Sequence, residues 1–241
     1  MASSPLLLVQ TGTPHDDVRH PHGDFPSWFS RAMGGAVETE GVRVFEGKSL
    51  PPPDANRIAV ITGSWAMVTD RLPWSEATAQ WIRDAMTIDM PLFGVCYGHQ
   101  LMAHALGGRV DYHPRGREVG CRRITLSPAA ADDALVGTLP PTFMAHLMHE
   151  QSIVELPPGA HALAASDHDA YQIVRYGANA LSVQFHPEFT PAITETCIRR
   201  RTDTLLAEGM HPEELVRNLQ DTHEAQSLLA QFVQRATLER V

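Results

Sequence analysis

Short, almost wholly apolar runs are the feature that most constrains the fold of this chain. They lie at Leu6–Val9, within Arg57–Thr62 and at Pro91–Val95, and runs of this length suit strands that are covered on both faces. Residues 25–33, 74–86 and 99–106 predict helices, the middle one from apolar residues near helical spacing. This alternation predicts an α/β fold: an open, mostly parallel sheet with helices on both faces.

The remaining segments predict additions to this sheet. Short strand candidates in the middle of the chain would add antiparallel strands, at residues 122–126, 152–156, 162–165, 172–176 and 180–185. The polar stretch Thr11–Asp24 is predicted to be a loop at the carboxyl edge of the sheet, where open α/β proteins place their sites. After residue 190 the pattern becomes helical, at 194–208 and 212–238. We therefore expect a domain over residues 1–190 and a helical C-terminal extension of the same domain over 191–241.

Charge and cysteine content narrow the class of protein. The 241 residues include 28 acidic and 19 Lys or Arg side chains, for a net charge of -9. Such a surface is unsuited to neutralising phosphates, so we expect no nucleic-acid partner. Three widely spaced cysteines do not suggest a disulfide framework, and no apolar run approaches the roughly 18 residues of a membrane helix. A cytoplasmic location without membrane association is expected.

Cys96 stands at the junction of a predicted strand and a predicted helix. Residues 94–100 read Gly-Val-Cys-Tyr-Gly-His-Gln, and a nucleophile between two glycines at such a junction is typical of a nucleophile elbow. The helix start supplies free N–H groups and a positive dipole end, which favour a thiolate. A cysteine is more often a small buried apolar side chain, and this is our interpretation of Cys121 and Cys197. The setting of Cys96 instead predicts a nucleophile.

His186 and Glu188 are the groups that could serve this nucleophile. They follow the apolar run 180–185 in the sequence Phe-His-Pro-Glu, which puts His186 at a strand end. The imidazole would take the thiol proton and later protonate a leaving nitrogen, while the carboxylate would orient the imidazole. His-Pro-Glu alone is a weak signal in a chain with 13 histidines, so the prediction depends on its combination with Cys96.

A glycine after the second apolar run suggests a place for an oxyanion. Gly63 follows the strand within 57–62, and its backbone N–H could complete an oxyanion hole with the N–H of Tyr97. Without the other two motifs, a plain strand-end turn is the simpler interpretation. Cys96 and His99 have a ligand-like spacing, but no second pair completes four metal ligands. We therefore expect neither a metal nor a cofactor.

Together these motifs resemble the class I glutamine amidotransferases, and among them the stand-alone proteins similar to the amidotransferase part of GMP synthase. The resemblance extends from about Leu6 to Phe189. It is carried by Ile-Thr-Gly-Ser at 61–64, the cysteine motif at 94–100, Met-His-Glu-Gln at 148–151 and Val-Gln-Phe-His-Pro-Glu at 183–188. The family implies a flavodoxin-like sheet, in agreement with the alternation of strands and helices.

The resemblance also implies roles for particular residues. It implies a catalytic triad of Cys96, His186 and Glu188. It implies an oxyanion hole formed by the backbones of Gly63 and Tyr97. It also implies a substrate pocket that includes Gln100, His149 and Gln151. The implied reaction is hydrolysis of a γ-glutamyl amide through a γ-glutamyl thioester, with ammonia or an amine leaving first. Two departures from the family pattern leave the identity of the substrate undetermined. Many relatives have a small polar residue in place of Met67, and His-Gly-Asp is common in place of His149-Glu150-Gln151.

Three functions are compatible with these motifs. The first is an amidotransferase subunit that cleaves glutamine and delivers ammonia to a separate synthetase, because roughly 50 residues after the resemblance are too few for the ATP-pyrophosphatase domain of a complete GMP synthase. The second is an autonomous hydrolase of γ-glutamyl peptides or conjugates. The third is an inactive regulatory homologue, which the complete triad argues against. An oligomer is compatible with each of the three.

Overall fold

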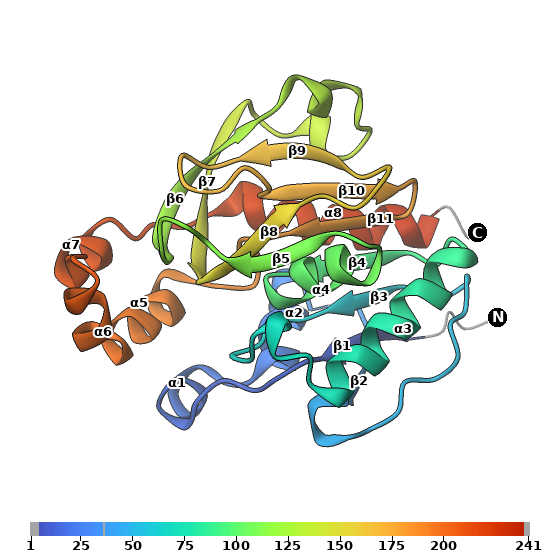
Figure 1. The fold of residues 1–241 in the computed structure, drawn as a ribbon, viewed down its shortest axis with the longest axis horizontal. Coiled ribbons are helices and arrows are strands. Elements are labelled where there is room, and N and C mark those ends of the chain that lie inside the picture. The colour runs from blue at the N-terminus through green and yellow to red at the C-terminus, as the bar shows by residue number, and fades with distance from the viewer. Residues whose placement is uncertain (1–4, 36, 239–241) are drawn as a thin grey trace.

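The computed structural model describes residues 5–35 and 37–238, and its main feature is a nine-stranded sheet (Figure 1). The first five neighbours in the sheet are parallel: β2 (Thr39–Arg43), β1 (Leu6–Gln10), β3 (Ala59–Ile61), β4 (Leu92–Val95) and β11 (Ala180–Val183). The sheet continues with antiparallel strands: β10 (Ile173–Gly177), β9 (His161–Ala165), β6 (Glu118–Leu126) and β7 (Thr142–His149). The predicted α/β class and the additional antiparallel strands are both confirmed.

The apolar strands supply side chains to two cores, one on each face of the sheet. Leu6 and Leu8 of β1 belong to one buried cluster, whereas Leu7 and Val9 belong to the other. Successive residues of a strand point to opposite faces, so a strand covered on both faces has to be apolar throughout. This requirement explains the uninterrupted apolar runs in the sequence.

Helices cover each face, as the sequence predicts (Figure 1). Two of them pack with the Leu6–Leu8 cluster, namely α2 (Phe25–Ala32) and α8 (His223–Leu238). Two others pack with the opposite cluster, namely α3 (Pro73–Thr87) and α4 (Tyr97–Ala105). The predicted helices at 25–33, 74–86 and 99–106 are therefore confirmed with small shifts of their ends.

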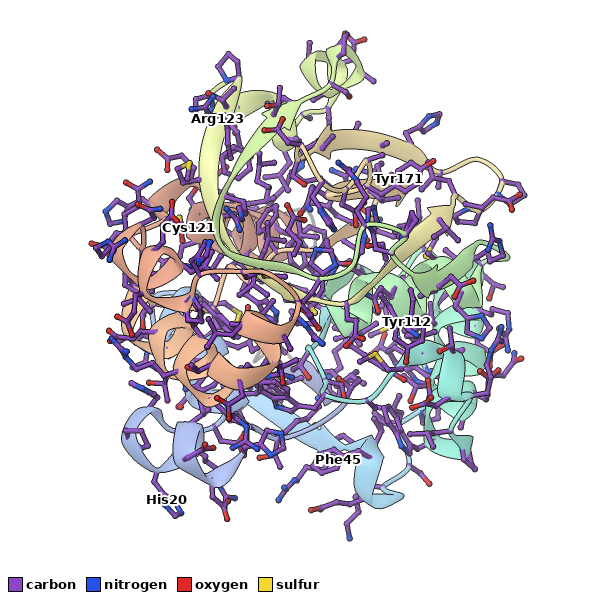
Figure 2. The ribbon with its side chains drawn as sticks, turned by 60° about the vertical axis from the view of Figure 1, so that its left-hand side comes forward. His20, Phe45, Tyr112, Cys121, Arg123 and Tyr171 are labelled. Carbon is purple, nitrogen blue, oxygen red and sulfur yellow. The ribbon has the colours of Figure 1, made fainter. Side chains whose placement is uncertain are left out.

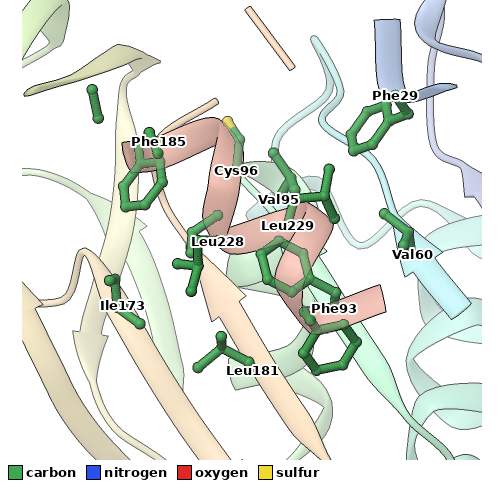
Figure 3. Packing of buried hydrophobic residues seen from close by; sticks show 14 of the residues in the cluster. Phe29, Val60, Phe93, Val95, Cys96, Ile173, Leu181, Phe185, Leu228 and Leu229 are labelled. Atoms are coloured by element: carbon green, nitrogen blue, oxygen red, sulfur yellow. The ribbon is translucent and has the colours of Figure 1, made fainter. Parts of the chain in front are cut away.

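The last helix completes a core rather than lying on the surface. Leu228 and Leu229 of α8 are fully buried, and Figure 3 shows them against Phe93 and Val95 of β4. The ring centroids of Phe93 and Phe232 lie 5.1 Å apart. The division into 1–190 and 191–241 stays a prediction, and residues 1–4, 36 and 239–241 lie outside the described residues.

Two predictions about the ends of the domain were wrong in detail. The segment predicted as a loop at 11–24 contains a helix, α1 (Asp16–His22). Its first turn carries Asp16 and Asp17, which the positive end of a helix favours, and Val18 anchors it in the core. The predicted helices 194–208 and 212–238 are each divided, into α5 (Pro191–Arg200) and α6 (Thr202–Ala207), and into α7 (Pro212–Arg217) and α8.

Two strands were not predicted at all. One is β7, the partner of β6 along its whole length. The other is β5 (Arg109–Tyr112), which pairs with β8 (Gln151–Glu155) in a separate two-stranded sheet. β5 is mostly exposed, with only Val110 buried, so it lacks the apolar pattern by which a strand is recognised in a sequence.

Candidate active site

Cys96 is the single residue between the end of β4 and the start of α4. Its backbone has φ 51° and ψ −99°, a region that ordinary side chains avoid at a cost of about 1–3 kcal/mol. The turn is tight as well, because a side-chain carbon at Gly98 would lie 2.4 Å from the carbonyl oxygen of Ile61. The strand–turn–helix junction predicted around Cys96 therefore has the geometry of a nucleophile elbow.

His186 is held beside Cys96 by the pairing of β11 with β4. Val183 pairs with Val95 in this parallel ladder, and the N–H of Cys96 donates to the carbonyl of Val183 at 2.9 Å. His186 follows three residues after Val183, and its Nδ1 lies 2.8 Å from Oε1 of Glu188. The imidazole is stacked on the ring of Phe189, with centroids 3.9 Å apart. Carboxylate and aromatic ring together fix the orientation of the imidazole.

The surroundings of His186 favour its charged form. Burial by itself lowers the pKa of His186, but the negative charges of Glu188 and Cys96 and hydrogen bonds to both groups raise the pKa to about 10. Opposite charges at such short range are the strongest stabilisers of a buried ionised group. An imidazolium beside the Cys96 sulfur is the partner that stabilises a thiolate.

Gly63 and the start of α4 lie next to this pair. A side-chain carbon at Gly63 would be 3.1 Å from Cε1 of His186 and 3.7 Å from Cβ of Cys96, so Gly63 contacts both. α4 begins at Tyr97, and the first N–H groups of a helix have no partner inside it. The Tyr97 hydroxyl is 2.7 Å from the hydroxyl of Ser75, which commits the phenol to the core and leaves the backbone as its contribution to the site.

The side chains of Gln100 and His149 hold the segment at Gln151 in place. Gln100 Nε2 donates to the Gln151 carbonyl at 2.6 Å and to Oε1 of Gln184 at 2.9 Å. His149 Nδ1 lies 3.0 Å from the same carbonyl. Gln151 Nε2 in turn donates to the hydroxyl of Thr69 at 2.5 Å. These side chains are therefore engaged with one another, and they form a fixed wall.

The surroundings of His149 favour its charged form. Its Nε2 lies 3.0 Å from Oε2 of Glu118, and its Nδ1 faces a carbonyl oxygen; two acceptors require a proton on each nitrogen. Burial lowers the pKa of His149, but the hydrogen bond to Glu118 and the charges of Asp169 and Glu118 outweigh this and raise it. Glu118 was not among the predicted residues.

One pocket brings most of the predicted residues together. Six of them line it: Cys96, Tyr97, Gln100, His149, Gln151 and His186. Glu188 lies behind the pocket, bonded to His186, and Gly63 lies against Cys96 and His186. The wall also includes side chains that sequence reasoning missed, namely Trp65, Arg117 and Arg201 with the aromatic rings of Phe25, Trp28 and Phe189.

The missed residues give little signal in the sequence. Trp65 lies two residues after Gly63, which offers a hint of proximity. Arg201 ends a run of three arginines and lies between α5 and α6, more than a hundred residues from Cys96. No sequence pattern links position 201 to position 65, so only the folded chain could place them in one pocket.

The other two cysteines lie in a different environment. Cys121 is on β6, near the C-terminal helices (Figure 2), and burial raises the pKa of its thiol. Burial also raises the pKa of Cys197, on α5, to about 12. Both are buried free thiols. Their environments oppose ionisation, in contrast to the cationic partner beside Cys96.

Two further observations concern metals and membranes. Within residues 5–35 and 37–238, no group of three or more His, Cys, Asp or Glu side chains is arranged to hold a metal ion. In the same part of the chain, no helix combines the length and apolar character required to cross a membrane. The cytoplasmic location stays a prediction.

Comparison with known proteins agrees with the fold and shows the family. The family model "Glutamine amidotransferase class-I" matches residues 58–202, and the chain belongs to this family. It is 35% identical over 176 residues to a glutamine-hydrolyzing GMP synthase subunit of Haloarcula marismortui, covering 71% of this chain and 84% of that protein. It is 26% identical over 208 residues to gamma-glutamyl peptidase 4 of Arabidopsis thaliana, covering 83% and 82%.

The fold has close counterparts among solved structures. A glutamine amidotransferase from Thermotoga maritima superposes with a TM-score of 0.74 at 19% identity, covering 97% of this chain and 99% of that one. At this identity the likeness concerns the fold. The sheet and its flanking helices are therefore those of the class I glutamine amidotransferases.

Proposed function

We propose that this chain hydrolyses γ-glutamyl amides through a thioester on Cys96. The observation that carries the proposal is the convergence of Cys96 and the His186–Glu188 pair, at the ends of two adjacent strands, on one pocket. Membership of the family supports the same chemistry. The triad and the roles of the remaining pocket residues are part of this proposal.

The reaction takes place in two steps. The Cys96 sulfur attacks the γ-carbonyl carbon, the C–N bond breaks, and His186 gives its proton to the departing nitrogen, so that ammonia or an amine leaves. Water then attacks the thioester carbon and gives a proton to His186. The C–S bond breaks, glutamate leaves and the thiolate–imidazolium pair is restored. In each step the N–H groups of Gly63 and Tyr97 would stabilise the negative oxygen of the tetrahedral intermediate.

Glutamine is the first candidate substrate. In this version the chain releases ammonia to a separate synthetase subunit, as the similarity to the GMP synthase subunit of Haloarcula marismortui suggests. Such a protein is expected to have weak glutaminase activity by itself and to be stimulated by its synthetase.

A γ-glutamyl peptide is the second candidate substrate. The side chains of Trp65, Arg117 and Arg201 extend the pocket wall beyond the triad, and this extension could accommodate a group larger than ammonia. Similarity to gamma-glutamyl peptidase 4 over most of both chains supports this version. It predicts full activity without a partner.

The experiment measures the release of glutamate from glutamine and from a panel of γ-glutamyl dipeptides. Cys96→Ser is expected to reduce kcat at least 1,000-fold (about 4 kcal/mol) for every substrate, because nucleophile removal in related triads is of that size or larger. Cys121→Ser serves as the matched control and should retain wild-type activity.

Each outcome separates the candidate functions. Activity that survives in Cys96→Ser would rule out the thioester mechanism. Dipeptide turnover at least ten times that of glutamine would favour the autonomous hydrolase, and stimulation by a synthetase would favour the ammonia-supplying partner of that synthetase. An absence of turnover with every substrate would favour an inactive regulatory homologue.

A further inference from the structure

Trp65 and Arg201 carry two unpartnered nitrogens at the candidate pocket. The indole Nε1 of Trp65 and Nη1 of Arg201 are buried, and neither has a hydrogen-bond partner among the described residues. The guanidinium of Arg201 lies over the indole ring, 4.2 Å from its centroid. Both side chains line the pocket that contains Cys96. Buried donors are nearly always paired, because an unpaired one costs about 1–3 kcal/mol. A ligand that accepts hydrogen bonds would remove this cost.

The charge of Arg201 is also uncompensated. Its two neighbours in the run are paired, Arg199 with Glu195 and Glu213 and Arg200 with Asp17. Arg117, the other cation of the pocket, pairs with Glu150 at 2.8 Å and Glu208 at 3.2 Å. For Arg201 there is no ion pair within residues 5–35 and 37–238. Burial and the charge of Arg117 lower its pKa, but a guanidinium keeps its proton in proteins.

A carboxylate is the group that fits these donors. A planar guanidinium fork matches the two oxygens of a carboxylate, and the stacked indole restricts the rotation of the guanidinium and adds its own N–H donor. We take the glutamyl half to lie against the wall at Gln100, His149 and Gln151, the substrate pocket that the family resemblance implies. Trp65 and Arg201 belong to other elements, the loop after β3 and the α5–α6 junction.

We propose that Arg201 and Trp65 bind a carboxylate on the leaving group, so that the substrate class is a γ-glutamyl amide of an amino acid. This inference rests on the proposed function and names the substrate class of that site. It assigns Arg201 to substrate binding, whereas the chemistry stays with the triad.

Two probes that differ by one carboxylate test the proposal. They are γ-glutamylglycine and γ-glutamylmethylamide, with glutamine as a third substrate. Wild-type protein is expected to prefer γ-glutamylglycine over the methylamide. Arg201→Gln should lower kcat/KM for γ-glutamylglycine about 10- to 100-fold, the range of a charge-assisted hydrogen bond, and change the other two less than 3-fold. Arg201→Lys should restore part of the preference, and Arg199→Gln is the matched control.

An equal loss for all three substrates would overturn the proposal, because it would assign Arg201 to the glutamyl half or to the fold. An absence of preference in the wild-type protein would overturn it as well. In both cases turnover itself leaves the proposed function intact.

If no substrate is turned over, binding measurements distinguish the proposed carboxylate site from the proposed hydrolase. Calorimetric titration of Cys96→Ala with the same probes should give tighter binding of γ-glutamylglycine, and the preference should vanish in Cys96→Ala/Arg201→Gln. Binding with this preference but without turnover in the wild-type protein would support the carboxylate site and reject the hydrolase. Equal binding of both probes, or binding of neither, would overturn the carboxylate site.

Discussion

His186 depends on its neighbours for its charge. Full burial works against an imidazolium, and the positive charge persists because Glu188 accepts a hydrogen bond from Nδ1 at 2.8 Å and because the Cys96 sulfur lies on its other side. The raised pKa, about 10, means that His186 stays protonated through neutral pH. In the proposed reaction, His186 would therefore give a proton to the leaving nitrogen without first taking one from water.

Glu188→Gln tests this electrostatic coupling. The amide oxygen of Gln can still accept the hydrogen bond, so the change removes mainly the charge. We expect the pKa of His186 to fall by about 1–3 units. Protonation of the leaving nitrogen needs the imidazolium, which is present below this pKa and lost above it, so the alkaline limit of glutamate release should move to lower pH.

The measurement is a proton NMR titration of the His186 ring, run in parallel with the pH dependence of glutamate release. Glu195→Gln, on the surface of α5, is the matched control and should change neither. An unchanged His186 titration in Glu188→Gln would show that the charge of Glu188 has no part in stabilising the imidazolium.

At the scale of elements, the approach of α4 to β3 determines the elbow. The Gly98 N–H donates to the carbonyl of Thr62 at 3.2 Å, and there is no room for a side chain beside Ile61. The helix can begin directly after Cys96 only because its second residue has no side chain.

Gly98→Ala is therefore expected to destabilise the fold by about 1–3 kcal/mol, the usual range for overpacking, and to displace Cys96. Urea unfolding and glutamate release measure the two effects. Gly41→Ala on β2, where a new side-chain carbon meets nothing within 4 Å, should change stability by less than about 0.5 kcal/mol. Equal stability of the two variants would contradict the role of this close approach.

Elements with a uniform pattern can be predicted from the sequence. The runs in β1, β3 and β4 are apolar because both faces are covered, and α3 has a clear apolar stripe. β7 was missed because its apolar pattern is interrupted by two buried polar side chains, His146 and His149. α1 was missed for a similar reason: Val18 is its one buried residue, and its polar sequence resembles a loop.

At the scale of the whole molecule, two pairs of buried histidines have opposite effects on how the stability of the fold depends on pH. Burial lowers the pKa of His99 to about 3 and that of His146 to about 4, below the unfolded value of about 6.5. The contribution of these two histidines to the stability of the fold is present above pH 6.5 and is lost as the pH falls. For His149 and His186 the folded pKa is raised, so their contribution is present below pH 6.5 and is lost as the pH rises.

We predict that His146→Phe reduces the loss of stability at acid pH. Each buried neutral histidine costs about 1.4 kcal/mol of stability per pH unit below 6.5, or about 2 kcal/mol at pH 5. Between pH 7 and pH 5 the variant should lose about 2 kcal/mol less than wild type, measured by urea unfolding at both pH values. Met144→Leu, on the same strand, should keep the wild-type slope. An equal slope in His146→Phe would contradict the prediction.

Of the residues that line the pocket, those in short sequence motifs were predicted, and those of the outer wall were not. Cys96, His186 and Gly63 belong to short motifs whose spacing reflects chemistry. Arg201 and Trp65 come together because the α5–α6 junction lies against the loop after β3, and a contact of this kind leaves no local pattern in either segment.

The pairing of β4 with β11 also matters for redesign of the pocket. Cys96 and His186 follow the paired ends of these two strands, so their separation is fixed by the sheet and does not depend on the surface segments. The wall formed by Trp65, Arg117 and Arg201 lies on separate segments that can mutate independently. Redesign of specificity can therefore be confined to those segments, with Cys96 and His186 left in place.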